Sequence, residues 1–196
     1  MKTYQITYEN RTQFVKELEC IREERDRQHY YNLMFYYSWT SEVSSLLDTV
    51  IQCIEECFSD ALHYGNESSG NIFRGKLAYG LTVNCVCFEE RDSYTKLLWV
   101  EDGTEFASLD DLWDYCRHEE NLRGVELIPT SGYCDYLGID GSIPDISSDV
   151  LIFGGAAISY INPSYMSRII FKGHPMTDVG MLAVLYYGSN LNLSST

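Results

Sequence analysis

Positive charge is scarce in this chain of 196 residues. It carries 14 lysine and arginine side chains against 29 aspartate and glutamate side chains, so its formal net charge is −15 at pH 7. Nucleic acids are bound by clustered basic side chains that neutralise the phosphates and release their counterions, and a surface this acidic repels them instead. The sequence therefore predicts no nucleic-acid partner.

Long apolar runs are also missing. The two longest, residues 150–158 and Met181–Tyr187, are each about half the ~20 residues that a membrane-spanning helix needs. The N-terminus lacks the apolar segment of a secretory signal. We therefore expect a protein that does not insert into a membrane and that works in the cytoplasm. With 45% hydrophobic and 22% charged residues, the composition is that of a folded globular domain.

Motifs for metal or cofactor chemistry are weak. The seven cysteines are an odd number and lie within apparently regular elements, which favours reduced core thiols over a disulfide framework. Cys53 with Cys57, or Cys85 with Cys87, could share a metal in geometry, but their apolar neighbours favour a packing role. Residues 70–76 match the spacing of a phosphate-binding loop, yet Leu77 replaces the required hydroxyl and a strand pattern follows. We expect no metal and no cofactor.

Periodicity predicts a mixture of helices and strands. Asn10 caps a helix with Phe14, Leu18 and Ile21 on one face, and this helix is expected to end in a charged stretch over 22–27. A long apolar stripe predicts a helix over 43–58. The strands predicted before and after it, 31–37 and 61–64, form a βαβ unit with this helix, and the second strand is expected to end at Gly65. A capping pattern from Ser108 predicts a short third helix.

The remaining elements are expected to be strands. A hairpin is predicted between 82–88 and 96–100, and further strands over 125–128, 150–153, 168–171 and Met181–Tyr187, with an irregular segment over 130–148. The predicted fold class is α+β: mixed, largely antiparallel sheets flanked by helices, in a single domain over residues 1–196. Because a buried strand comes so near the final residue, we expect either a sheet that ends there or a fragment of a longer protein.

Two junctions with glycine are the best candidates for a binding site. Residues 65–70 follow one predicted strand and residues 154–157 follow another, so small residues and free backbone amides collect at strand ends. Ligand sites favour such places, because a small residue lets backbone donors approach a carboxylate or carbonyl. Tight turning and close packing would explain the same glycines equally well.

The order of these junctions resembles the FIST sensor domain family, a ligand-sensing module of bacterial signalling proteins, over most of the chain. The features that carry the resemblance are a Tyr-Ser pair ending a strand before the long helix, a strand running into a Gly/Ser-rich loop, and an apolar strand ending in Phe-Gly-Gly-x-Ala. In this chain they are Tyr37-Ser38, Gly65-Asn66-Glu67-Ser68-Ser69-Gly70 and Phe153-Gly154-Gly155-Ala156-Ala157. Two positions depart from the family pattern: Glu67 replaces the usual serine, and Asn71 replaces a glutamate.

The resemblance implies a cytoplasmic domain that senses a small polar, amino-acid-like metabolite and relays its binding to a C-terminal output module, such as a diguanylate cyclase or a kinase. Family members continue into a second half, so residues 1–196 are expected to be an N-terminal sensory region. The implied ligand-binding residues are Ser38, Trp39, Gly65, Glu67, Ser68, Ser69, Gly70, Gly154, Gly155 and Ala156. Glu67 would pair with an amino group, the serines would hydrogen-bond the ligand, Trp39 would cover an apolar part, and the glycines would expose amides.

Two alternatives remain from the sequence. Sixteen tyrosines suit a protein-interaction or dimerisation module, although they suit strands equally. A hydrolase built around Cys134 or Ser68, with His63 or His174 as the base, can be drawn on paper, but no motif sets its geometry. We therefore assign no catalytic residue and expect the chain not to be an enzyme.

Overall fold

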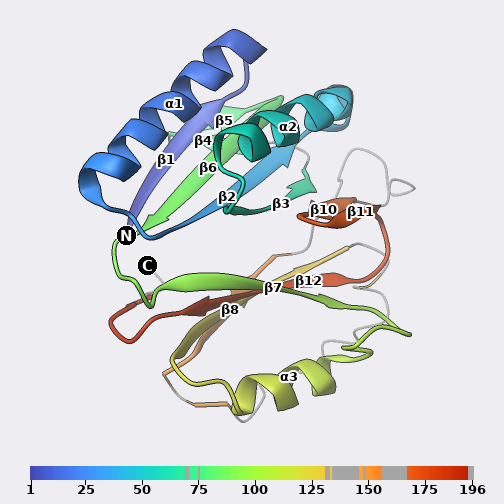
Figure 1. The fold of residues 1–196 in the computed structure, drawn as a ribbon. Coiled ribbons are helices and arrows are strands. Elements are labelled where there is room, and N and C mark those ends of the chain that lie inside the picture. The colour runs from blue at the N-terminus through green and yellow to red at the C-terminus, as the bar shows by residue number, and fades with distance from the viewer. Residues whose placement is uncertain are drawn as a thin grey trace.

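Four layers make up the fold (Figure 1). The structure, a computed structural model, describes residues 1–68, 71–74, 76–130, 133, 146–147, 149–155 and 167–193. Within these residues two sheets pack face to face; two helices cover the outer face of one sheet and a third covers the outer face of the other. The predicted class, mixed and largely antiparallel sheets flanked by helices, is confirmed.

The larger sheet has six strands and the smaller has four. In spatial order, the larger sheet contains β1 (Lys2–Thr7), β6 (Leu81–Phe88), β2 (Asn32–Trp39), β3 (Leu62–Glu67), β10 (Ile169–Phe171) and β11 (His174–Thr177). The smaller sheet contains β7 (Tyr94–Val100), β12 (Met181–Tyr187), β8 (Leu122–Pro129) and β9 (Leu151–Gly154). Two pairs are parallel, β2 with β3 and β8 with β9, and the others are antiparallel.

The first helix, α1 (Arg11–Gln28), begins and packs as its sequence predicts. Oδ1 of Asn10 accepts a hydrogen bond from the Gln13 amide (3.0 Å), and Phe14, Leu18 and Ile21 are buried. The helix ends in the charged stretch as predicted, with Arg25 and Arg27 in its last turn. Its last residue is Gln28, and the capping residue His29 takes the left-handed conformation (φ 58°).

The βαβ unit is confirmed, with a different helix start. Residues Ser41–Leu46 form a 3-10 turn (η1), and the α-helix α2 spans Leu47–Cys57. Its buried side chains Leu47, Val50, Cys53 and Ile54 face the sheet formed by β2 and β3. The capping box that opens α3 (Leu109–Arg117) is also confirmed, since Ser108 and Asp111 each bond to the backbone amide of the other.

The predicted hairpin between 82–88 and 96–100 is wrong. Strand β6 pairs with β1 and β2 in the larger sheet, whereas β7 pairs with β12 in the smaller one. The short connection therefore crosses between the sheets instead of folding back. Strands β1 and β2 occupy the two edges of β6, and side chains of all three strands form the helix-covered core. The pairing of β6 is therefore decided by burial in this core and not by its closeness to β7 in the sequence.

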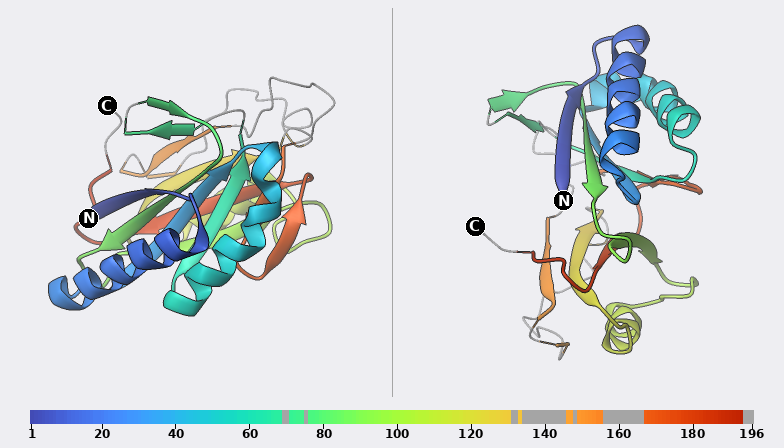
Figure 2. Two further views of the ribbon diagram at one scale, coloured as in Figure 1. Left: turned by 90° about the horizontal axis from the view of Figure 1, so that it is seen from above. Right: turned by 60° about the vertical axis from the view of Figure 1, so that its left-hand side comes forward.

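Several strands are missing from the sequence prediction. They are β1, β11 and the two strands of a hairpin, β4 (Asn71–Phe73) with β5 (Lys76–Ala78). This hairpin occupies the segment that resembles a phosphate-binding loop, and it projects to the side of the larger sheet opposite α1 and α2 (Figure 2). The described residues after Lys76 continue as strands, so the helix that a phosphate loop opens is not formed there.

The core has three parts, one in each space between layers. Val83, Cys85 and Cys87 lie on the helix-covered side of β6, and burial raises the pKa of Cys85. Between the sheets pack apolar side chains of both, and a third cluster lies under α3. Among the described helices, none is long and apolar enough to cross a membrane.

Candidate functional site

The carboxyl ends of β2 and β3 bring part of the predicted site together. These parallel neighbours place Ser38 beside Asn66 and Trp39 beside Glu67, and the Ser68 amide donates to the Trp39 carbonyl (2.8 Å). Ligands in sheets with parallel strands gather at such ends, where several strands present side chains to one place. Ser69, Gly70 and Ala156 lie outside the described residues.

Gly65 does not end its strand, contrary to the sequence prediction. It lies in the interior of β3 and pairs with Tyr37 on one side and Ile170 on the other. A Cβ at this position would lie 2.2 Å from Cδ2 of Tyr37. The glycine therefore admits the tyrosine ring against the backbone, which favours the packing explanation for this residue over the exposed amide.

The two residues at the end of β2 face opposite sides of the sheet. Trp39 is fully buried in the helix-covered core, and its Nε1 has no hydrogen-bond partner within the described part of the chain. Ser38 lies on the side that faces the smaller sheet, the same side as Tyr36 two residues earlier in the strand. Ser38 and Trp39 therefore cannot line the same face of one pocket.

Glu67 is buried and already has a cationic partner. Its Oε2 accepts from Nε of Arg168 (2.8 Å) and its Oε1 from Nη2 (3.3 Å), while the side chain of Arg168 remains about one-third exposed. A ligand amino group at Glu67 would have to displace this bidentate partner. The role expected for Glu67 is thus filled from within the protein, by a residue 101 positions further along the chain.

The second junction lies at the end of β9 in the smaller sheet. Gly154 has φ +142°, and a Cβ there would lie 2.0 Å from the carbonyl oxygen of Leu127. Gly155 has open space around it, and its amide donates to the same carbonyl (3.2 Å). Gly154 therefore serves close backbone packing, whereas Gly155 leaves room beside the strand end.

A hydrogen-bonded bridge joins the two sheets near these junctions. The Tyr64 hydroxyl, from β3, donates to Oε2 of Glu126 in β8 (2.9 Å), and Glu126 is the register partner of Phe153 in β9. In Figure 1 β2, β3 and β8 run toward the same side, and β9 is parallel to β8. Both junctions thus lie at one end of the two-sheet sandwich.

Sequence reasoning missed the side chains at the centre of this bridge. Glu126 also accepts from the Tyr186 hydroxyl (2.7 Å), and the Tyr36 hydroxyl donates to Oδ1 of Asn66 (2.6 Å). Burial raises the pKa of Glu126, while the bonds from Tyr186 and Tyr64 act in the opposite direction. The available signal was a single carboxylate inside the apolar run 125–128.

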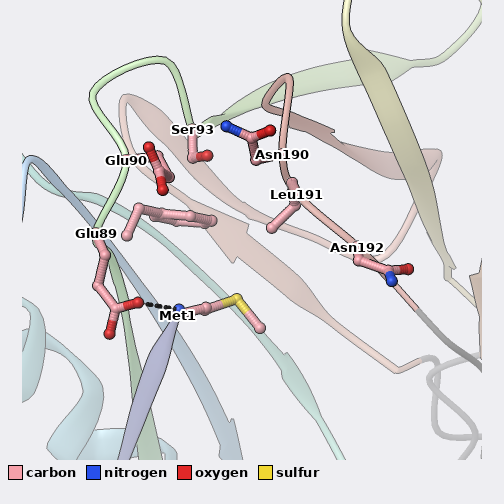
Figure 3. A pocket seen from close by; sticks show the side chains of 8 residues that line it. Met1, Glu89, Glu90, Ser93, Asn190, Leu191 and Asn192 are labelled. Atoms are coloured by element: carbon pink, nitrogen blue, oxygen red, sulfur yellow. Dashed lines mark hydrogen bonds and ion pairs between the residues drawn. The ribbon is translucent and has the colours of Figure 1, made fainter.

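Two hollows lie elsewhere on the surface. One of about 230 Å³, lined by Met1, Glu89, Ser93 and Asn190 among others, is at the end where β1 begins, and the Met1 ammonium pairs with Glu89 beside it (2.8 Å; Figure 3). The other, of about 480 Å³, runs along the edge strand β1 under α1. Neither is lined by a residue of the predicted site.

Both histidines considered for hydrolase chemistry are engaged: His174 stacks on Phe171 with ring centroids 4.5 Å apart, and His63 lies in the core. Nδ1 of His63 lies 3.3 Å from the Tyr37 hydroxyl and Nε2 lies 3.2 Å from Oε1 of Glu55. Cys134 lies outside the described residues, and Ser68 belongs to the backbone pairing at the end of β3. No group of three or more metal-ligating side chains occurs in the described ranges.

His63 should make stability depend on pH. Burial lowers its pKa, so below the ordinary value of about 6.5 the unfolded chain takes up a proton that the folded protein does not. Stability from this group is present above about pH 6.5 and is lost as the pH falls below it. Urea unfolding between pH 7.5 and 5.5 should show a shallower decline for His63→Gln than for the unmodified protein; parallel declines would contradict this.

Comparison with known proteins adds no relative. No protein-family model matches the chain, and no curated protein matches it significantly.

Proposed function

We propose that this chain is a small-molecule-binding sensory domain of a bacterial signal-transduction protein. It acts in the cytoplasm and relays ligand occupancy to a C-terminal output module, such as a diguanylate cyclase or a kinase. The ligand is a small polar metabolite, and no catalytic step is assigned to the domain. The resemblance to the FIST family stated above motivates the relay.

One observation carries the proposal. Polar side chains line the inter-sheet side of β2 and β3 at their carboxyl ends, and Tyr36, Asn66 and Glu126 are only half-buried there. Met34, Leu182 and Val184, on the same inter-sheet face, are buried. A few polar groups that converge at a partly open end beside such apolar side chains are typical of a binding site for a small molecule.

The same bridge offers a route for the relay. Tyr64 connects the larger sheet to Glu126 and Tyr186 of the smaller sheet, so a ligand that exchanges hydrogen bonds with these groups would favour one arrangement of the two sheets over another. A ligand shifts such an equilibrium only by its differential affinity for the two arrangements. The proposed signal is therefore a change in sheet packing at this end.

A thermal-shift screen of polar metabolites tests the binding. A compound held at about one hundred times its dissociation constant stabilises the folded state by about 2.7 kcal/mol, which raises the melting temperature by several degrees. We expect at least one such compound, and we expect Asn66→Ala to abolish its effect, since Asn66 lies at the strand ends that define the site.

The matched control is Asn190→Ala, which alters an asparagine in the hollow of Figure 3. It should leave the shift unchanged. A shift that survives Asn66→Ala but disappears with Asn190→Ala would place the ligand at the other end of the molecule and overturn the proposed site. A screen with no stabilising compound would overturn the function.

A further inference from the structure

Glu126 is a half-buried carboxylate whose hydrogen bonds come from neutral groups. The hydroxyls of Tyr64 and Tyr186 both donate to Oε2, at 2.9 and 2.7 Å. Among the described residues, Oε1 has no hydrogen-bond donor and neither oxygen forms an ion pair. Counting only the described residues, one oxygen of Glu126 remains available as an acceptor and no cationic side chain pairs with the carboxylate.

The other buried carboxylate shows what is missing at Glu126. Glu67 is matched by Arg168 through both of its oxygens. Burying a carboxylate without a countercharge costs stability, so proteins ordinarily pair it or leave it exposed. Glu126 is partly buried and has no such match within the described part of the chain, so its free oxygen can receive a cation from solution.

Aromatic rings surround this carboxylate on both sheets. Tyr36 and Tyr64 lie with their ring centroids 5.2 Å apart, and Phe153 and Tyr186 lie 5.7 Å apart. Each pair includes one tyrosine whose hydroxyl donates to Glu126. The faces of such rings attract an ammonium group within about 6 Å of their centroids, and clusters of them bind methylated ammonium groups in proteins.

Solvent reaches the cluster. Phe153 is 36% exposed, and Tyr36, Asn66 and Glu126 are half-buried. The net charge of −15 raises the local concentration of cations near the protein and speeds their capture. A hard metal ion is a poorer match, because it takes six or more oxygen ligands and Glu126 is the one carboxylate that the described residues place in this cluster.

We propose that the ligand is a small organic cation, a primary amine or a quaternary ammonium, whose charge lies at Oε1 of Glu126 and is flanked by the rings of Tyr36, Phe153 and Tyr186. This inference rests on the proposed function and names its ligand class. Tyr64 and Tyr186 orient the carboxylate, and Gly155 leaves room at the adjacent strand end for the remainder of the ligand.

Isothermal titration calorimetry with matched probes tests the charge requirement. Choline and butylamine represent the cation class, 3,3-dimethylbutan-1-ol is the neutral counterpart of choline, and alanine represents a zwitterion. We expect choline or butylamine to bind at least about tenfold more tightly than the neutral alcohol, and Glu126→Gln to weaken cation binding by about tenfold to a hundredfold.

The matched control is Glu119→Gln. Glu119 also accepts a tyrosine hydroxyl, from Tyr187 (2.6 Å), and its removal changes the net charge equally, so it should leave cation binding intact. Circular dichroism verifies the fold of both variants. If Glu126→Gln fails to fold, the affinity of the unmodified protein for choline is measured at several pH values instead. The charge of choline does not change over this range, so its affinity should fall as the pH is lowered and Glu126 becomes protonated.

The outcomes separate this inference from the proposed function. If the protein binds a zwitterionic or anionic metabolite through Asn66 while Glu126→Gln has no effect, the cation inference fails and the sensory function stands. If choline and its neutral counterpart bind equally, the charge requirement is refuted. If no compound of any class binds, both proposals fail together.

Discussion

Replacing Arg168 by methionine is expected to lower the free energy of unfolding by about 3 kcal/mol, and Glu67→Gln by only about 1 kcal/mol. The asymmetry follows from burial, because Glu67 has 4% of its side chain exposed and Arg168 has 32%. Removing the arginine leaves a buried carboxylate without a countercharge, whereas removing the carboxylate leaves a guanidinium that water can reach.

Urea unfolding of both single variants and the double variant at pH 7.5 measures this. The double variant should be more stable than Arg168→Met alone, since the unmatched carboxylate is gone. Equal losses for the two single variants would show that the pair is hydrated and carries little of the stability at this strand end.

Gly154→Ala should destabilise the protein by about 3 kcal/mol, because its Cβ would be placed 2.0 Å from a backbone oxygen that belongs to a paired strand. The conformation of Gly154, with φ +142°, adds strain for any residue with a side chain. The clash cannot be relieved by rotating a neighbouring side chain, because the atom that the Cβ meets is the backbone carbonyl oxygen of Leu127.

The adjacent glycine provides the control. Nothing lies within 4 Å of a Cβ built at Gly155, so Gly155→Ala should change stability by less than about 0.5 kcal/mol. Denaturant unfolding of the two variants tests the difference. Similar effects would mean that the second junction is loosely packed, and the packing explanation for Gly154 would then fall.

Helices were the most predictable part of the fold. The first and third begin at Asn10 and Ser108, because capping side chains sit next to the amides they satisfy. The strands β2, β6, β8 and β12 could also be identified from local sequence, because each contains an alternating or continuous run of apolar residues. Edge strands such as β1 carry one exposed side and little alternation, and they were missed.

The site was predictable only in outline. The strands that carry the two junctions were identified, but β3 continues through Gly65 to Glu67. Ser38 and Trp39 face opposite sides of the sheet, and Glu67 is paired with Arg168. Glu126, Tyr64 and Tyr186 come from three strands in two sheets, and no local spacing connects them. The FIST resemblance remains a hypothesis.

Sequence alone determined the fold class, the starts of the first and third helices and the parallel β2–β3 unit, because each depends on side chains a few residues apart. Tertiary structure alone decided which sheet receives β6 and which receives β7, and so which residues meet between the sheets. Strand pairing depends on the burial of a whole sheet face, which is built from strands far apart in the sequence. In the same way, the carboxylate of Glu126 meets the Tyr64 hydroxyl only when the two sheets stack.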